Sequence, residues 1–226
     1  MAQHVLVVLP HPDDETFGCG GTIALFTKSG IPVTYVCATL GQMGRNMGKP
    51  FFATRESLSH VREAELKEAC NALGIKQIIK LGLWDKMIEF EDQEALTNRL
   101  EQIISEVKPS LVLTHYPGYA VHPDHNALGE VTIRAISRFP AHERPIVYAH
   151  AFSRMCQDVI GPPDIVNDIS AVADVKLAAI HAHRSQSQLM FGRLEEGQSK
   201  DGKEGAPKKS IPNFLEQESF WVYRFE

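Results

Sequence analysis

Near its amino terminus the chain contains Val5-Leu6-Val7-Val8-Leu9, and after Pro10 it continues with His11-Pro12-Asp13-Asp14-Glu15. The apolar run is typical of a buried strand, and the polar cluster crowds metal-ligand and proton-transfer side chains together. A related pattern recurs later, where Leu111-Val112-Leu113-Thr114 precedes His122-Pro123-Asp124-His125. If both runs are parallel strands of one sheet, both clusters lie at its carboxyl edge, where open α/β folds place their active sites.

Strand-like and helix-like segments alternate around these two runs. Apolar and β-branched residues predict strands over 4–9, 32–39, 76–81, 110–114 and 145–151, and helical spacing predicts helices over 16–30, 55–73, 92–107 and 125–138. Gly74 is predicted to end the second helix, because glycine tolerates the left-handed conformation common there. Repeated strand–helix units predict an α/β fold with a mostly parallel sheet covered by helices. The segment 218–225 alternates polar and aromatic residues and predicts a strand that closes an edge.

Length and composition predict one soluble globular domain over residues 1–226, with 43% hydrophobic and 23% charged residues. A net charge of −5 gives no basic surface for nucleic acid. No stretch approaches the roughly 18 apolar residues of a membrane span. The first residues lack a signal-peptide pattern, and the four cysteines are scattered without a C-x-x-C pair. These features predict a cytoplasmic protein with reduced thiols.

Two segments interrupt the alternation of strands and helices. Residues 41–54 carry three glycines, two methionines and two adjacent phenylalanines. This segment is either an irregular surface loop or a lid beside the site, because it follows the second strand at the carboxyl edge of the sheet. Residues 195–212 are rich in Gly, Lys and Glu. We expect both segments to be mobile loops.

The two polar clusters supply the ligands of a catalytic metal site. Such a site combines three protein ligands with an open position for water, and a bound zinc ion lowers the pKa of that water to about 7. The first cluster offers His11, Asp13 and Asp14, and the second offers His122 and His125. From the residues alone, one aspartate ligates while the other acts as general base, and one histidine ligates while the other faces the substrate carbonyl.

Two further acidic residues flank these groups. Asp124 lies between the two histidines and is predicted to orient the non-ligating one through a hydrogen bond. Glu15 lies in the first helical turn after the first cluster, where a carboxylate complements the helix dipole.

Together these motifs resemble the PIG-L/LmbE-like family of metal-dependent de-N-acetylases. The similarity is carried by His11-Pro-Asp-Asp-Glu15 with Gly20-Gly21, Arg62-x-x-Glu65 with Ala69 and Leu73-Gly74, His122-Pro-Asp-His125, and His183-Arg-Ser-Gln186. The resemblance spans most of the chain. It implies a Rossmann-like α/β fold with helices on both faces of the sheet, and it implies a homo-oligomer.

The resemblance also implies a role for each residue of the two clusters. The metal ligands would be His11, Asp14 and His125, holding Zn²⁺, with Fe²⁺ or another divalent ion as alternatives. The general base would be Asp13. His122 would stabilise the tetrahedral intermediate and help protonate the leaving amine, with Asp124 beside it as a further catalytic residue.

Within the family, the loop residues 44–48 and 53–56 are most similar to those of the N-acetylglucosaminyl-malate deacetylases of bacillithiol biosynthesis. The substrate would then be a small N-acetyl sugar conjugate, and the products would be acetate and a free amine. Arg45, Arg55 and Arg62 are predicted to bind it, because guanidinium groups pair well with the two carboxylates of malate. For Arg62, an ion pair with Glu65 or Glu63 on the helix surface explains the residue equally well.

Several alternatives remain open at this point. The same acetamide occurs in inositol conjugates and chito-oligosaccharides, so the sequence does not choose the aglycone. Two histidines and one carboxylate also describe Fe(II) oxygenases, although those use β-rich barrels. A non-catalytic metal- or sugar-binding module would not need an unliganded acid and base beside its metal. Packing or surface roles are predicted for His115, His150 and His181.

Overall fold

A computed structural model describes residues 3–188 and 213–225 of the chain. The seven strands are β1 (Val5–Leu9), β2 (Val33–Thr39), β3 (Gln77–Leu83), β4 (Leu111–His115), β5 (Ile146–His150), β6 (Ile165–Asp168) and β7 (Gln217–Val222). The α-helices are α1 (Asp14–Lys28), α2 (Leu58–Leu73), α3 (Gln93–Val107), α4 (Pro123–Ser137), α5 (Cys156–Ile160) and α6 (Ala173–Ala182). Short 3₁₀ turns are η1 (Ile88–Phe90), η2 (Ser170–Val172) and η3 (Asn213–Leu215).

The strands form one sheet in the order β3-β2-β1-β4-β5-β7-β6. The five strands from β3 to β5 are parallel, whereas β7 pairs antiparallel with both β5 and β6. The chain winds outward from β1 in one direction through β2 and β3, and in the other through β4 and β5. The junction of β1 and β4 is therefore the topological switch point, where crevices form in open α/β sheets.

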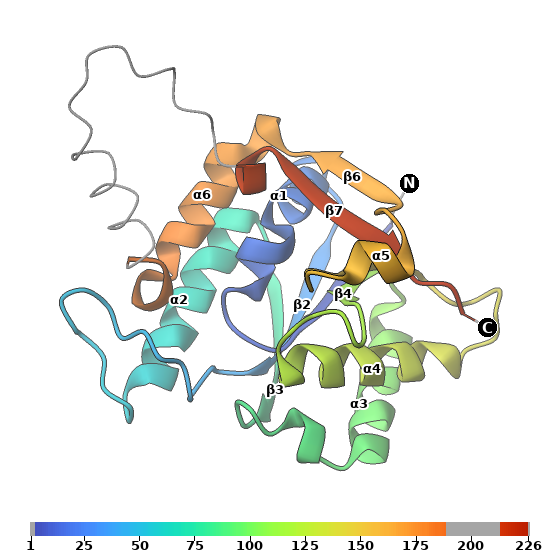
Figure 1. The fold of residues 1–226 in the computed structure, drawn as a ribbon, viewed down its shortest axis with the longest axis horizontal. Helices are drawn as coiled ribbons and strands as arrows, with labels where there is room; N and C mark the ends of the chain where they lie inside the picture. Colours follow the sequence, from blue (N-terminus) through green and yellow to red (C-terminus); the bar gives the residue numbers. More distant parts are fainter. Residues whose placement is uncertain (1–2, 189–212, 226) are drawn as a thin grey trace.

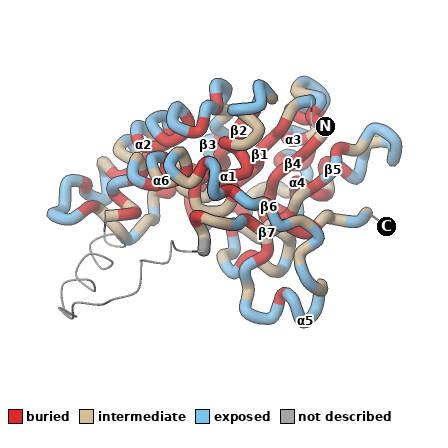
Figure 2. The backbone as a smooth tube through the Cα atoms, turned by 90° about the horizontal axis from the view of Figure 1, so that it is seen from above, coloured by how far each residue is buried: buried red, intermediate tan, exposed pale blue. Residues whose placement is uncertain are grey.

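Helices cover both faces of the sheet and bury two separate apolar cores (Figure 1). One core lies under α1, α2 and α6 and contains the inward residues Val5 and Val7 of β1. The other lies under α3 and α4 and contains Leu6 and Val8 of the same strand. Because neighbouring residues of β1 point to opposite faces, all five of its residues are buried. Figure 2 shows the buried backbone concentrated in these central strands.

The predicted Rossmann-like fold is confirmed, and Gly74 ends α2 with a φ of 80°. Two predictions differ from the structure. The carboxyl-terminal strand β7 does not close the edge, because the short strand β6 pairs with its outer side. The predicted elements also lack β6, α5 and α6; of these, β6 and α5 are too short for a periodic pattern to be evident. The predicted mobile loop 195–212 lies outside the described residues.

A buried ion pair ties β7 to the opposite layer. Lys176 of α6 lies 2.6 Å from the carboxylate of Glu218, and both side chains are almost completely buried. The same carboxylate accepts hydrogen bonds from the backbone N–H groups of Gly21 and Thr22 at 2.8 and 2.7 Å. These N–H groups follow a kink at Cys19 inside α1, so Glu218 caps the second half of that helix.

Candidate metal and catalytic site

The loops after β1 and β4 bring the two polar clusters together at the carboxyl edge of the sheet, as predicted. They line an open cleft of about 350 Å³. The residues around it are His11, Asp13, Asp14, Met43, Gly44, Arg45, Arg62, Asp85, Lys86, His122, His125 and Gln186. The cleft thus combines groups from both motifs with the start of the loop 41–54 and with the segment that follows β3.

Three side chains in this cleft form a compact donor set. The Nδ1 atom of His11 lies 3.2 Å from Nε2 of His125 and 3.3 Å from the carboxylate of Asp14. The other oxygen of Asp14 lies 3.2 Å from the same nitrogen of His125. A tetrahedral zinc ion with bonds of about 2.0–2.1 Å would separate its ligand atoms by about 3.3–3.4 Å. The spacing of these three residues therefore fits a divalent metal.

Hydrogen bonds to the outer nitrogen of each imidazole determine which ring nitrogen carries the proton. The far nitrogen of His11, Nε2, lies 3.1 Å from Asp124 and 3.2 Å from Asp85. The far nitrogen of His125, Nδ1, lies 3.2 Å from the carbonyl oxygen of Ala120. Since carboxylate and carbonyl oxygens accept hydrogen bonds, both far nitrogens are the N–H donors. The near nitrogens then present lone pairs, as metal ligands require.

The electrostatics of the donor set also suit a cation. Burial alone would lower the pKa of His11, but the carboxylates of Asp124, Asp14 and Asp85 raise it well above its ordinary value. Burial likewise opposes the charge of Asp14, yet His125 and His11 hold the pKa of its carboxyl well below the usual range. The site therefore favours one positive charge between these groups, and a bound metal would replace a proton there.

Three further residue triads have ligand atoms within 4.8 Å of one another, namely His11–His122–His125, Asp14–His115–His125 and His11–Asp85–Asp124. The ring of His115 stacks on that of His125 at 4.0 Å with an interplanar angle of 17°. His115 is buried, and burial followed by the charge of His125 lowers its pKa strongly. It is therefore a neutral ring that packs against the ring of His125.

Asp13 lies beside the donor set, but its carboxylate pairs with an arginine. Its carboxylate forms a 3.1 Å ion pair with Arg62, which comes from α2 and is buried. Burial raises the pKa of Asp13 to about 6, against the opposing charge of Arg62. The backbone of Asp13 has a φ of 111°, a left-handed conformation that costs about 1–3 kcal/mol for a residue with a side chain. Such strain is concentrated at functional sites.

His122 precedes α4 and caps it. Its Nδ1 atom accepts a hydrogen bond of 3.2 Å from the backbone N–H of Asp124. Burial, followed by the nearby charge of His11, lowers the pKa of His122, so the ring is neutral. The remaining nitrogen, Nε2, then carries the proton, and His122 lines the cleft. This ring can donate a hydrogen bond to an oxygen bound there.

The structure corrects the prediction for Asp124. Its carboxylate does not orient His122 but binds Nε2 of His11, together with the backbone N–H groups of Lys86 and Ile88 at 2.7 and 3.3 Å. Asp124 is completely buried, so its carboxylate acts on a proposed metal ligand. Only its backbone N–H contacts His122, as described above. Asp85, which the sequence analysis missed, contacts the same nitrogen of His11.

The three predicted substrate-binding arginines have different positions. Arg45 lines the cleft, and its contact with substrate stays a prediction. Arg62 also borders it, but its guanidinium pairs with Asp13 rather than with Glu65 or Glu63. Arg55 is exposed and donates to the backbone carbonyls of Gln42 and Gly44 at 3.2 and 2.9 Å, so it braces the loop 41–54 and does not line the cleft.

Two further features were not expected from the sequence. Lys86 lines the cleft, and among the described residues its ammonium group has no ion-pair partner. Glu15 does not simply face the helix dipole, because it is completely buried and lies 2.6 Å from His183. The motif around His183 was recognised in the sequence, but no periodic pattern could reveal its partner.

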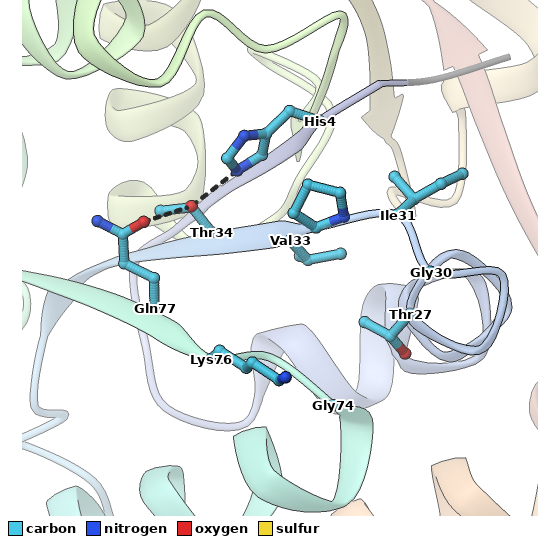
Figure 3. A pocket seen from close by; sticks show the side chains of 10 residues that line it. His4, Thr27, Gly30, Ile31, Val33, Thr34, Gly74, Lys76 and Gln77 are labelled. Atoms are coloured by element: carbon cyan, nitrogen blue, oxygen red, sulfur yellow. Dashed lines mark hydrogen bonds between the residues drawn. The ribbon is translucent and has the colours of Figure 1, made fainter.

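A second hollow, of about 310 Å³, lies at the opposite, amino-terminal end of β2 and β3 (Figure 3). His4, Thr34 and Gln77 form a chain of hydrogen bonds along it, at 2.9 and 3.0 Å. These three polar side chains therefore satisfy one another, and the hollow contains neither of the polar motifs. The cleft at the carboxyl edge is the candidate active site.

The chain is similar to known proteins both in sequence and in fold. A family model described as GlcNAc-PI de-N-acetylase, PIG-L, matches residues 6–136. The chain is 52% identical to a probable N-acetyl-alpha-D-glucosaminyl L-malate deacetylase 2 from Bacillus cereus, over 100% of both chains.

Among solved structures, the fold is similar to that of N,N'-diacetylchitobiose deacetylase from Pyrococcus horikoshii. The TM-score is 0.71 at 24% identity, covering 98% of this chain and 84% of that one. It is also similar to 4-carboxy-2-hydroxymuconate hydratase from Pseudomonas putida, with a TM-score of 0.70 at 22% identity, covering 99% and 97%. At these identities the likeness shows the fold alone. Within the described part of the chain, every helix is too short or too polar to cross a membrane.

Proposed function

The chain belongs to the PIG-L family of de-N-acetylases, and from this membership we propose that it hydrolyses the N-acetyl group of N-acetylglucosaminyl-malate. The products would be acetate and the free amine, a step of bacillithiol biosynthesis. The observation that carries the proposal is a carboxylate with a raised pKa, Asp13, and a neutral imidazole, His122, in one cleft with a three-residue donor set.

The metal would be held by His11, Asp14 and His125. We propose Zn²⁺, because two imidazoles and one carboxylate are a frequent donor set of hydrolytic zinc. When bound, the ion polarises the acetamide oxygen and makes water a better nucleophile at neutral pH. Asp124 and Asp85 keep the ring of His11 in the required tautomer.

The remaining groups would move the protons. Asp13 accepts a proton from the attacking water, and Arg62 holds its carboxylate in place. His122 donates a hydrogen bond from Nε2 to the acetamide oxygen as negative charge develops on it. The amine must also gain a proton as the C–N bond breaks, and a proton held at Asp13 or His122 is available for this step.

The malate part of the substrate would contact two cations at the cleft, Arg45 and Lys86. Both line it, and neither has an ion-pair partner among the described residues. Asp124 binds the backbone N–H of Lys86, so the same carboxylate fixes one metal ligand and one proposed specificity residue. Arg55 does not line the cleft and is not proposed to contact substrate.

The test is release of primary amine by the zinc-loaded protein. N-acetylglucosaminyl-malate is compared with the inositol conjugate, diacetylchitobiose and free N-acetylglucosamine. We expect the highest kcat/KM with the malate conjugate. A higher kcat/KM with another sugar would support deacetylation but reject the malate conjugate as the substrate. Release of amine from none of the sugars would reject the proposed function. Turnover that depends on O₂ would instead favour an oxygenase.

Self-association and a cytoplasmic location are further proposals. Phe51, Trp84 and Phe90 are 81%, 58% and 70% exposed, which supports a contact that would cover them. Light scattering coupled to size-exclusion chromatography tests the first proposal, since a monomeric mass across micromolar concentrations would reject it. Fractionation of producing cells tests the second.

A further inference from the structure

A buried hydrogen-bonded pair lies directly behind Asp13. Nε2 of His183 contacts Oε1 of Glu15 at 2.6 Å, and both side chains are completely shielded from solvent. The second oxygen of Glu15, Oε2, accepts a hydrogen bond of 2.9 Å from the backbone N–H of Asp13. One carboxylate thus joins a buried imidazole to the peptide of the proposed base.

The backbone at Asp13 has an unusual conformation that needs support from neighbouring groups. The φ of 111° at Asp13 is disfavoured for a residue with a side chain. On its other side, the carbonyl oxygen of Asp13 accepts from the backbone N–H groups of Thr16 and Phe17, both at 3.0 Å. The Glu15 carboxylate supplies the contact on the N–H side, so the peptide groups on both sides of the Asp13 Cα atom are held.

The segment that carries His183 is itself fixed by α2. Two residues after His183, Ser185 donates its backbone N–H and its hydroxyl to Glu65, both at 2.7 Å. Glu65 lies on the same helix as Arg62, which pairs with the carboxylate of Asp13. Helix α2 therefore holds Asp13 by two routes, directly through its side chain and indirectly through the segment that carries His183.

We propose that the buried Glu15–His183 pair is a positioning device that holds the backbone of Asp13 in its left-handed conformation and so aims the carboxylate into the cleft. This inference rests on the proposed function, because Asp13 is a base only if the chain is a deacetylase. His183 is a positioning residue, since it acts through Glu15 and does not line the cleft. The proposal gives the first residue of the motif His183–Gln186 a role; the last residue, Gln186, lines the cleft.

The chain offers a matched control in the pair of Lys176 and Glu218. It has the same separation of 2.6 Å and nearly the same burial, and its carboxylate also accepts backbone N–H groups, here in the middle of α1 after the kink at Cys19. Neither Lys176 nor Glu218 lines the cleft or contacts Asp13. Removing the basic side chain of each pair therefore compares similar losses of buried contacts, and only in the first pair does the carboxylate bind the backbone N–H of Asp13.

The experiment compares His183→Leu, His183→Gln and Lys176→Met in the zinc-loaded full chain. For His183→Leu we expect kcat to fall on the order of 10- to 100-fold, because small displacements of a catalytic group have effects of this size. KM and bound zinc per chain should stay within about twofold. His183→Gln can still donate to Glu15 and should restore most of kcat. Lys176→Met should lower Tm and leave kcat within about twofold.

A crystal structure of His183→Leu supplies a readout that does not depend on turnover. We expect the φ of Asp13 to leave the left-handed region, and an unchanged φ would overturn the inference even if the proposed function failed. The inference would also be overturned if His183→Leu lowered Tm but kept kcat, or if Lys176→Met lost kcat equally. Where His183→Leu does not fold, His183→Phe fills more of the ring's volume and receives the same tests.

Discussion

Nδ1 of His11 and Nε2 of His125 face each other at 3.2 Å, although the two residues come from different strand–helix connections. In each ring the opposite nitrogen has an acceptor of its own, Asp124 or the carbonyl of Ala120. Two lone pairs pointing at one another repel unless a proton or a cation lies between them. The carboxylate of Asp14 adds a negative charge beside both nitrogens, so the arrangement calls for a cation and makes a metal the simplest occupant.

Replacing Asp13 by Asn should lower kcat by about 10²–10⁴ without loss of bound metal, because the amide cannot accept the proton. Asparagine tolerates the left-handed conformation at this position and still offers Arg62 an oxygen. Steady-state kinetics and metal analysis of the purified variant measure both quantities. A kcat within about tenfold of the wild type would remove Asp13 from the role of general base.

Replacing Lys86 by Gln, or Arg45 by Gln, should weaken recognition of a charged aglycone only. Charge-assisted hydrogen bonds contribute about 1.5–3 kcal/mol each, so kcat/KM for the malate conjugate should fall at least about tenfold. Its dimethyl ester has the same skeleton without charge and should be hardly affected. Arg55→Gln is the matched control, since its guanidinium contacts loop carbonyls outside the cleft. Equal losses on diacid and diester would refute the assignment.

Replacing Asp124 by Asn should weaken metal binding by about 10- to 100-fold, because the carboxylate orients the ring of His11. Competition with a chromogenic chelator measures the affinity. If Asp124 acted mainly on His122 instead, metal affinity would stay at the wild-type value and only kcat would fall.

His150 should make the fold sensitive to acid. Burial lowers the pKa of His150 from about 6.5 to about 4, so the unfolded chain takes up the proton first. The contribution of the neutral His150 to the free energy of unfolding is therefore intact above pH 6.5. It is lost as the pH falls from 6.5 towards 4, by roughly 3 kcal/mol in all. Urea unfolding of chelator-treated wild type and His150→Phe between pH 7 and 5 measures this. Parallel curves for the two proteins would show that His150 does not contribute.

The sequence predicted the parts of the molecule that depend on local pattern. The runs 5–9 and 111–114 are apolar throughout because both faces of their sheet are covered, and their parallel pairing brings the two motifs together. The order of β7 and β6 could not be predicted, because only pairing in three dimensions places the short strand outside the longer one. The predicted roles of the cleft residues stay predictions until the variants are measured.

Within the site, residue type and spacing identified the donors but not their partners. Asp124 is adjacent in sequence to the histidine motif, yet its carboxylate turns to His11 on the other loop. Arg62 has acidic neighbours on its own helix, but burial selects the long-range partner Asp13. Glu15 and His183 are far apart in sequence. Such contacts follow from the packing of α2 and α6 against α1, which no periodicity encodes.

The most direct test of the central claim is amine release from N-acetylglucosaminyl-malate before and after metal removal. The protein is stripped with a chelator, dialysed, and supplied again with one equivalent of Zn²⁺ per chain. We predict that activity disappears on stripping and returns with zinc, while His11→Ala does not recover at the same zinc concentration. Full activity of the stripped protein, with metal shown to be absent, would contradict a metal-dependent deacetylase.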